Sequence, residues 1–151
     1  MLIETLKKQH QDLIRLAGEM DVMLERGDEA GARGVLSSLA QVLRTHLTLE
    51  DHEIYPGLIR AAQESKDERM LETAKMFANN MQRITESLRD FVARHEASFH
   101  LDRFQAGWRT LSTVLATRIA SEEKTLYPLY EQRVGVRAYG GSPPMSGSSE
   151  R

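Results

Sequence analysis

The chain has 151 residues, a formal net charge of −2 and a pI near 6.2, with 40% hydrophobic and 28% charged residues, as in a single globular domain. This balance supplies no basic field for nucleic acid or an anionic membrane surface. It has no cysteine, which excludes disulfides, thiolate metal sites and cysteine nucleophiles. No apolar run reaches membrane-spanning length, and the amino terminus lacks the apolar core of a signal peptide. The sequence therefore predicts a soluble, cytoplasmic protein.

The first predicted helix runs from about Leu2 to Leu24. Its apolar residues recur at steps of three, four or seven, and His10 falls on the same stripe. Arg26-Gly27-Asp28 is expected to end it.

The second predicted helix begins near Glu29 and carries His46 and Glu50 within its apolar stripe. Pro56 is expected to end or kink it, because proline lacks the amide hydrogen that a helix interior uses. A short helical piece from Gly57 to about Gln63 is expected to follow.

The second half repeats this pattern. Ser65 or Asp67 is a candidate N-cap for a third helix, whose buried stripe runs from Met70 to Phe91. Residues 95–100 are predicted as a connection, with His95 and His100 as ordinary loop residues. A fourth helix carries Phe104, Trp108, Leu115 and Glu122, and is expected to stop near Pro128. No segment alternates with period two, so the prediction is an all-α, up-down-up-down four-helix bundle.

The last residues differ in composition from the rest of the chain. Residues 135–151 are rich in Gly, Ser and Pro and cannot bury enough apolar surface to offset the entropy of ordering. The predicted domain organisation is therefore a bundle over residues 1–134 and a flexible tail over residues 135–151.

An internal repeat relates the two halves. H-L-T-L-E-D-H-E-I-Y-P, which begins at His46, aligns with R-I-A-S-E-E-K-T-L-Y-P, which begins at Arg118. Glu50 then matches Glu122, and Tyr55-Pro56 matches the equivalent pair at 127–128. This indicates a duplicated helix pair. By periodicity alone, the third helix should place Asn80 opposite His10 of the first.

Four residues of the repeat form a candidate metal site. His46 and Glu50 are four apart and share one helix face. With Glu122 and His10 they would bring two imidazoles and two carboxylates into the bundle interior, a set that suits iron, zinc or manganese. The alternatives are that His10 is a hydrogen-bonded core residue and that His46 and Glu50 form a surface pair.

These motifs resemble the hemerythrin-like, or HHE cation-binding, family over about residues 1–134. H-x-x-x-E-(D/E)-x-x-(I/L)-Y-P closes a helix twice, after an early histidine. The resemblance implies a four-helix bundle with a non-haem di-iron centre, one histidine from each helix, and bridging carboxylates. By position, it offers His10, His46, Glu50 and Glu122 as ligands.

Two positions depart from the family pattern. Asn80 stands where the third-helix histidine is expected and Arg118 where the fourth-helix histidine is expected. Asn80 could offer a weak oxygen ligand, whereas Arg118 has no lone pair to donate. Its fixed charge could instead replace a second metal ion and neutralise Glu50 and Glu122 through bidentate hydrogen bonds. The other readings are that Arg118 points outward, or that the bundle holds no metal.

Three further residues are candidates for contacts with the ligands. Glu53 returns to the face of His46 and Glu50 one turn on and is a candidate spare ligand or ion-pair partner. Tyr55 and Tyr127 are candidate hydrogen-bond donors to the ligands, or packing residues.

The predicted function is small-ligand or redox sensing, or iron handling, at a mononuclear iron or zinc site. Diatomic molecules and peroxide are the candidate ligands. A dinuclear centre is disfavoured by the missing histidines, and no catalytic residue or substrate is indicated. The alternative is a metal-free bundle that serves as a scaffold or a regulatory interaction module. A protein partner or a homodimer is compatible with either reading.

Overall fold

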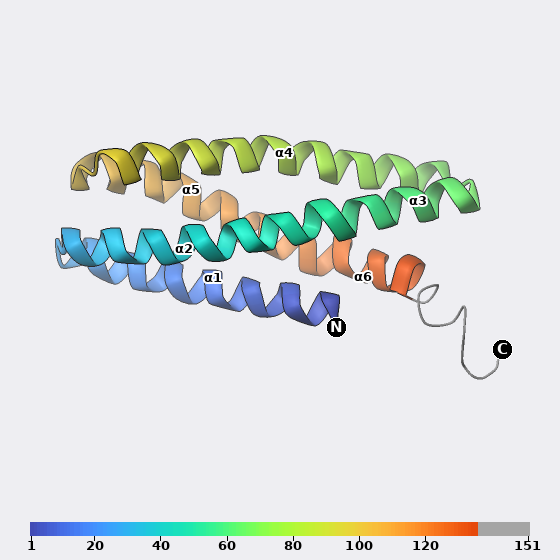
Figure 1. Ribbon diagram of the computed structural model, residues 1–151, viewed down its shortest axis with the longest axis horizontal. Helices are drawn as coiled ribbons and strands as arrows, with labels where there is room; N and C mark the ends of the chain where they lie inside the picture. The colour runs from blue at the N-terminus through green and yellow to red at the C-terminus, as the bar shows by residue number, and fades with distance from the viewer. Residues whose placement is uncertain (136–151) are drawn as a thin grey trace.

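The computed structural model describes residues 1–135 and shows four long antiparallel helical rods (Figure 1). The first rod is α1 (Leu2–Glu25). The second runs from α2 (Glu29–Leu49) through the π-helical turn η1 (Glu50–Ile54) into α3 (Tyr55–Ser65). The third is α4 (Glu68–Ala97). The fourth runs from α5 (Leu101–Ser121) through η2 (Glu122–Leu126) and α6 (Tyr127–Tyr130) to η3 (Glu131–Gly135). The predicted all-α four-helix bundle is confirmed. The expected tail lies almost wholly outside the described residues.

The turns between rods follow the local chemistry of the sequence. Gly27 adopts a positive φ of 66°, which glycine tolerates without a steric penalty, and this ends the first rod. Asp28 caps α2 by accepting a hydrogen bond from the amide of Gly31 at 2.8 Å. Asp67 caps α4 by accepting one from the amide of Met70 at 3.1 Å. Of the two candidate caps for that helix, the structure therefore uses Asp67, and Ser65 is the last residue of α3.

The expected stop near Pro128 is wrong, because the fourth rod continues to Gly135. The helical piece expected after Pro56, from Gly57 to about Gln63, is present within α3. Each proline lies just after a π turn and at the start of a further helical segment. In the π turns the amide of Tyr55 donates to the carbonyl of Glu50, and that of Tyr127 to that of Glu122, five residues back. A π turn changes the local hydrogen-bond ladder, so the proline ring and its missing donor are accommodated and the helix continues.

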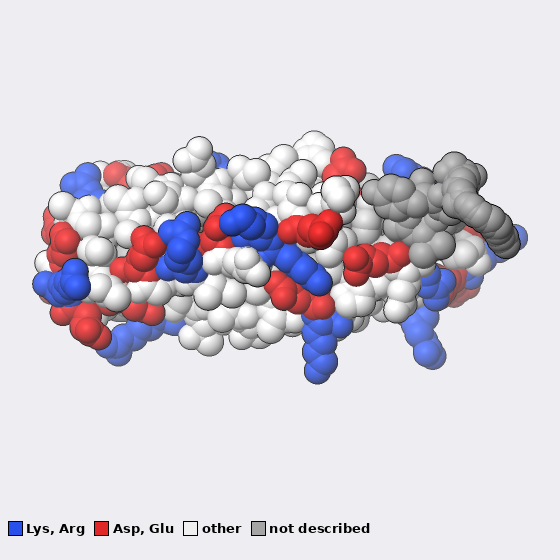
Figure 2. All heavy atoms as spheres, turned by 90° about the horizontal axis from the view of Figure 1, so that it is seen from below, with Lys and Arg blue, Asp and Glu red and all other residues white. Residues whose placement is uncertain are grey.

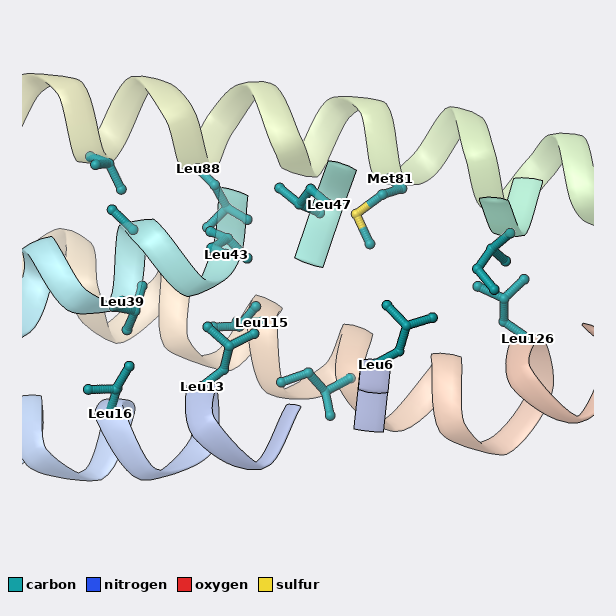
Figure 3. Close-up of a cluster of buried hydrophobic side chains, with 14 of the residues drawn as sticks. Leu6, Leu13, Leu16, Leu39, Leu43, Leu47, Met81, Leu88, Leu115 and Leu126 are labelled. Atoms are coloured by element: carbon teal, nitrogen blue, oxygen red, sulfur yellow. The ribbon is translucent and has the colours of Figure 1, made fainter. Parts of the chain in front are cut away.

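A continuous core of aliphatic side chains joins the four rods. Figure 3 shows part of it, with leucines from facing helices meeting along the bundle axis. Removing such a side chain from water contributes about 1.5–3 kcal/mol each, so this core is the main source of stability. The labelled members are Leu6, Leu13, Leu16, Leu39, Leu43, Leu47, Met81, Leu88, Leu115 and Leu126.

The predicted connection at residues 95–100 is shorter than expected. His95 belongs to α4 and is buried, not part of a loop, and only Ser98 to His100 link the helices. Its ring packs against Phe91 and Phe104, with centroids 4.4 and 5.1 Å away. Burial lowers the pKa of His95, and the nearby charges of Arg94 and His100 add to that shift. The packing of the His95 ring in this aromatic cluster stabilises the extra turn of α4.

The surface of the described bundle carries both charge signs. On the face in Figure 2, basic and acidic side chains are interspersed. The large exposed apolar side chains are few and lie on α1, α4 and α5 or at the amino terminus: Met1, Ile14, Val22, Met76 and Val114. Within residues 1–135, no helix combines the length and the apolar character needed to cross a membrane.

Candidate metal centre

Three helical rods bring the four predicted ligands together inside the bundle. His10 comes from α1, His46 and Glu50 from the second rod, and Glu122 from the fourth. One ligand atom from each lies within 4.8 Å of the others, and all four side chains are buried. The carboxylates of Glu50 and Glu122 are 0% and 1% exposed, so both are removed from solvent.

Each imidazole turns its Nε2 inward and holds its Nδ1 on an oxygen atom. Nδ1 of His10 donates to Oε2 of Glu123 at 2.7 Å, and Nδ1 of His46 donates to Oε1 of Gln9 at 2.9 Å. Such contacts fix the ring orientation and leave the inner nitrogen free to bind a cation, as histidines at metal sites commonly do. Neither Gln9 nor Glu123 was identified from the sequence. The repeated acidic residue after each buried glutamate was the available signal for Glu123.

The inner atoms are spaced like the ligands of one ion. Nε2 of His10 lies 3.1 Å from Nε2 of His46 and 2.8 Å from Oε1 of Glu122. Nε2 of His46 lies 3.2 Å from Oε2 of Glu50 and 3.4 Å from Oε1 of Glu122. Two atoms bound about 2.1 Å from a shared ion lie about 3.0 Å apart at a right angle and about 3.4 Å apart at the tetrahedral angle. The donor set therefore fits a cation such as iron or zinc.

Buried oxygens without hydrogen bonds support the same fit. Oε1 of Glu50 and Oε2 of Glu122 accept no hydrogen bond from the described residues, although both are shielded from solvent. Oε2 of Glu122 has only an ion pair with Nε of Arg118 at 3.4 Å. A buried carboxylate oxygen without a hydrogen bond is costly, because it has lost its contacts with water. A cation bound by these carboxylates would remove that cost.

Charge coupling sets the protonation of the site. Burial alone would lower the pKa of His46, but hydrogen bonds and charge attraction with Glu122 and Glu50 outweigh it and raise that pKa to about 9. Burial raises the pKa of Glu50 to about 7. Burial opposes the ionisation of Glu122, yet hydrogen bonds from His10 and His46 hold its pKa well below the usual value. Without a metal, the site thus holds an ionised Glu122 beside a protonated His46.

Tyr127 lies at the centre of this group. Its hydroxyl donates to Oε2 of Glu50 at 2.8 Å and lies 3.1 Å from both Oε1 of Glu122 and Nε2 of His10. Burial and the two carboxylates raise the pKa of Tyr127, which keeps the hydroxyl protonated in the metal-free site. The π turn η2 produces this placement, because it carries Tyr127 onto the face of Glu122 five residues back.

Arg118 points inward, but its contacts differ from those predicted. Its Nε lies 3.4 Å from Oε2 of Glu122, an ion pair without hydrogen-bond geometry. Its Nη2 donates to the carbonyl of Phe77 at 3.0 Å and to the hydroxyl of Tyr55 at 3.3 Å. The guanidinium carbon also sits 4.7 Å from the centre of the Phe77 ring. The contacts of the described residues include none between Arg118 and Glu50, so the expected bidentate bridge between the two carboxylates is not formed.

Two other expectations about side-chain direction are wrong. Asn80 is exposed, and the buried position on that turn of α4 is the next residue, Met81. One residue along an α-helix turns a side chain by about 100°, so a register set by periodicity alone fails at this precision. Glu53 is also exposed, because the π turn η1 changes the phase of the helix after Glu50.

A small cavity adjoins the inner atoms. Its volume is about 10 Å³, the size of one water molecule, and apolar side chains make most of its wall. Met81 lines it together with His10, His46, Arg118 and Glu122. The third-helix side of the site is thus closed by a thioether and aliphatic groups, not by a nitrogen ligand.

The fold and the buried histidine–carboxylate cluster define a class of helical-bundle proteins that bind a metal between facing helices. The family model for the hemerythrin HHE cation-binding domain matches residues 1–130. The chain therefore belongs to the hemerythrin HHE family. Searches of curated proteins and of solved structures find no match.

Proposed function

We propose that this protein binds a single non-haem iron or zinc ion through His10, His46, Glu50 and Glu122, and that this ion serves small-ligand sensing or iron handling. Two imidazoles with two carboxylates suit either metal. The ion would act as a Lewis acid toward a small ligand. The chain's own residues hold and orient the ligands, exclude bulk water and fix the local charge.

One observation carries the proposal. Nε2 of His46 faces both Glu50 and Glu122, and Nε2 of His10 faces Glu122 and Nε2 of His46. The Nδ1 atoms of the two rings donate to Glu123 and Gln9. A hydrogen-bonded core histidine needs partners for its nitrogens, but it does not need two rings and two carboxylates directed at one point. Placing four such groups in a core is costly unless a cation binds them.

Arg118 explains why one ion is proposed and not two. Its guanidinium stays charged, cannot ligate, and lies 3.4 Å from Glu122 on the side where a second ion would need a histidine. Together with a divalent ion, it would balance the two buried carboxylates and leave one positive charge. Met81, which closes the third-helix side of the site, supplies no nitrogen ligand either. The two replacements together favour a mononuclear site.

The size of the site limits its ligand. A cavity of about 10 Å³ has room for about one water molecule, so only a very small ligand could take that place, and the apolar wall favours an uncharged one. Diatomic gases and peroxide are the proposed ligands, and either would need the lining side chains to shift. Reversible oxygen binding by two irons is not proposed, because the second ion lacks its histidines.

Metal content tests the proposal. The purified, untagged protein is reconstituted with ferrous iron without oxygen, desalted and analysed for metal per chain. His46→Ala should lose the ion. His52→Ala is the matched control and should keep it, because His52 is only six residues from His46 in the sequence but its side chain is exposed. A wild type that retains no metal would refute the proposed function.

The place of Arg118 is tested by stoichiometry. The double variant Arg118→His/Met81→His supplies imidazoles on both closed sides of the site, and its metal content per chain should rise above that of the wild type. The single variant Met81→His is the control, because it adds a histidine to the site while Arg118 stays in place. If the double variant binds no more metal than the wild type, Arg118 does not occupy the place of a second ion.

The alternative function is a metal-free interaction module. The ion pair between Arg118 and Glu122 is the observation that favours it, because it already supplies one cation to the core. The exposed apolar residues Ile14 and Val22 on α1 and Met76 on α4 would then be the first places to examine for a partner or a second copy. A metal-free wild type would turn the search to that surface.

A further inference from the structure

We propose that Tyr127 is itself a ligand of the ion, bound through its phenolate oxygen, and not only a donor to the carboxylates. This inference rests on the proposed function and names a fifth ligand for the same site. It assigns a role that neither the residue pattern nor the family membership supplies, since the family's ligands are histidines and carboxylates.

The spacing of atoms carries the inference. The hydroxyl oxygen of Tyr127 lies 2.8 Å from Oε2 of Glu50, 3.1 Å from Oε1 of Glu122 and 3.1 Å from Nε2 of His10. These separations match those that join Nε2 of His10 and Nε2 of His46 to each other and to the carboxylate oxygens they face, which run from 2.8 to 3.4 Å. They also match the roughly 3.0–3.4 Å expected between neighbours around one ion. By distance, the hydroxyl is therefore a member of the shell and not a group behind it.

The ring is held in this position. Tyr127 is fully buried, and its ring stacks on His10 with centroids 5.4 Å apart and planes inclined by 18°. The π turn η2 keeps its backbone on the turn of Glu122. An ion that binds His10 and Glu122 would thus meet the Tyr127 oxygen without a change of rotamer.

Tyr55 is the natural comparison, because it occupies the equivalent place in the repeat. It is also buried and also follows a π turn. Its hydroxyl, however, accepts from Arg118 at 3.3 Å, and within the described residues it makes no hydrogen bond to any of the four ligands. The repeat therefore presents one tyrosine to the metal side and the other to the arginine side of the same core.

The charge of the core favours a phenolate on the metal side. A divalent ion and Arg118 carry three positive charges, and Glu50 and Glu122 carry two negative ones. A phenolate makes this buried set neutral, which matters because an unbalanced charge in a low-dielectric core is costly. Glu123 adds little to this balance, since its side chain is 40% exposed and solvated.

The step balances as an ordinary ligand exchange. The metal–oxygen bond forms, the O–H bond of Tyr127 breaks, and the proton leaves to solvent, as it does when other protic side chains become ligands. No electron is transferred. A bound cation reverses the preference of the metal-free site for the neutral phenol, because it becomes the largest local charge.

Ferric iron makes the inference visible, since a phenolate bound to it produces a charge-transfer absorption that a phenol does not. Wild type, Tyr127→Phe and Tyr55→Phe are loaded with iron and oxidised. Iron content, the visible spectrum and tyrosinate modes in resonance Raman are recorded, with circular dichroism to check folding. We expect the band in wild type and Tyr55→Phe, and its complete loss in folded Tyr127→Phe, whether or not that variant keeps its iron.

The outcomes separate the two proposals. Iron-loaded wild type without the band, or a band that survives in Tyr127→Phe, overturns the ligand role of Tyr127 and leaves the metal site intact. A band that is lost in Tyr55→Phe but kept in Tyr127→Phe would identify Tyr55 as the phenolate ligand, and this result would also overturn the ligand role of Tyr127. A wild type that binds neither iron nor zinc overturns both proposals.

Discussion

His10 and His46 show how single residues are prepared for a cation. The outer nitrogen of His10 is held by the half-exposed Glu123, and that of His46 by the uncharged Gln9. At the inner side, both rings share one carboxylate oxygen, Oε1 of Glu122, so the two Nε2 atoms are directed at the same point.

The residue scale predicts how metal binding depends on pH. The pKa of His46 is raised to about 9 and that of Glu50 to about 7 in the metal-free site. Metal must displace these protons, so affinity should rise with pH, by up to about tenfold per unit for each proton released. Zinc affinity measured by chelator competition between pH 6.5 and 8.5 checks this.

The sign of this effect follows from the raised pKa of His46. Below pH 9 the folded, metal-free site holds the proton, which stabilises the apo form and opposes the ion. Above pH 9 that competition is lost. His52→Ala should show the same pH dependence as wild type, because His52 is exposed. An affinity that stays flat between pH 6.5 and 8.5 would mean that His46 carries no proton in the free site.

At the scale of elements, the two π turns decide which side chains face the core. η1 follows α2 and η2 follows α5, each beginning at a buried glutamate and ending before a buried tyrosine. An uninterrupted α-helix would put residues four apart on one face, and the π turn makes it five. Tyr127 therefore joins the ligand group and Tyr55 contacts Arg118, while Glu53 points away to solvent.

The capping of α2 gives the prediction for this scale. Asp28 accepts a hydrogen bond from the amide of Gly31, which otherwise has no partner in the first helical turn. Asp28→Ala should lower the free energy of unfolding by about 1 kcal/mol. Chemical denaturation monitored by circular dichroism measures it.

Glu29→Gln serves as the matched control. Glu29 is exposed in the same first turn and makes no capping hydrogen bond, so its loss removes only a weak interaction with the helix dipole. Equal destabilisation by the two variants would show that the turn tolerates the loss of its cap. Metal content should be unchanged in both, because the cap lies far along α2 from His46.

At the scale of the whole molecule, the apolar core supports the polar site from both sides. Leucines from facing rods pack along the axis in Figure 3, and several of them also line the small cavity beside the inner ligand atoms. The four proposed ligands and Arg118 thus lie together between apolar side chains, whose burial offsets the cost of burying these charged groups. Buried His95 lies apart from them in its aromatic cluster.

A pair of neighbouring residues tests that division. Leu13 is fully buried and Ile14 is 57% exposed, although they are adjacent in α1. Leu13→Ala should lower the free energy of unfolding by about 2–5 kcal/mol, because it removes buried methyl groups and leaves a cavity. Ile14→Ala should change it by less than about 0.5 kcal/mol. Thermal and denaturant unfolding of both variants measure the difference, and similar values would contradict the assigned core.

The sequence by itself determined the helical class, the order of the rods and the four residues that meet inside the bundle. Periodicity fixes which face of a helix is apolar, and the repeat of E-acidic-x-x-aliphatic-Y-P identifies the polar residues within that face. Asp67 could be recognised, beside Ser65, as a candidate cap because a short side-chain oxygen can accept a hydrogen bond from a free amide of the first helical turn. Asp28 was expected only to help end the first helix, and its capping role came from the structure.

Only the tertiary structure decided the side-chain directions within one turn. Whether Asn80 or Met81 enters the core depends on the rotation of α4 against its neighbours, which periodicity defines to no better than a residue. The π turn that brings Tyr127 among the ligands adds one residue to a helical turn. Which atoms its hydroxyl then meets, on Glu50 and His10, depends on how the other rods pack against this turn, and the local sequence does not specify that packing.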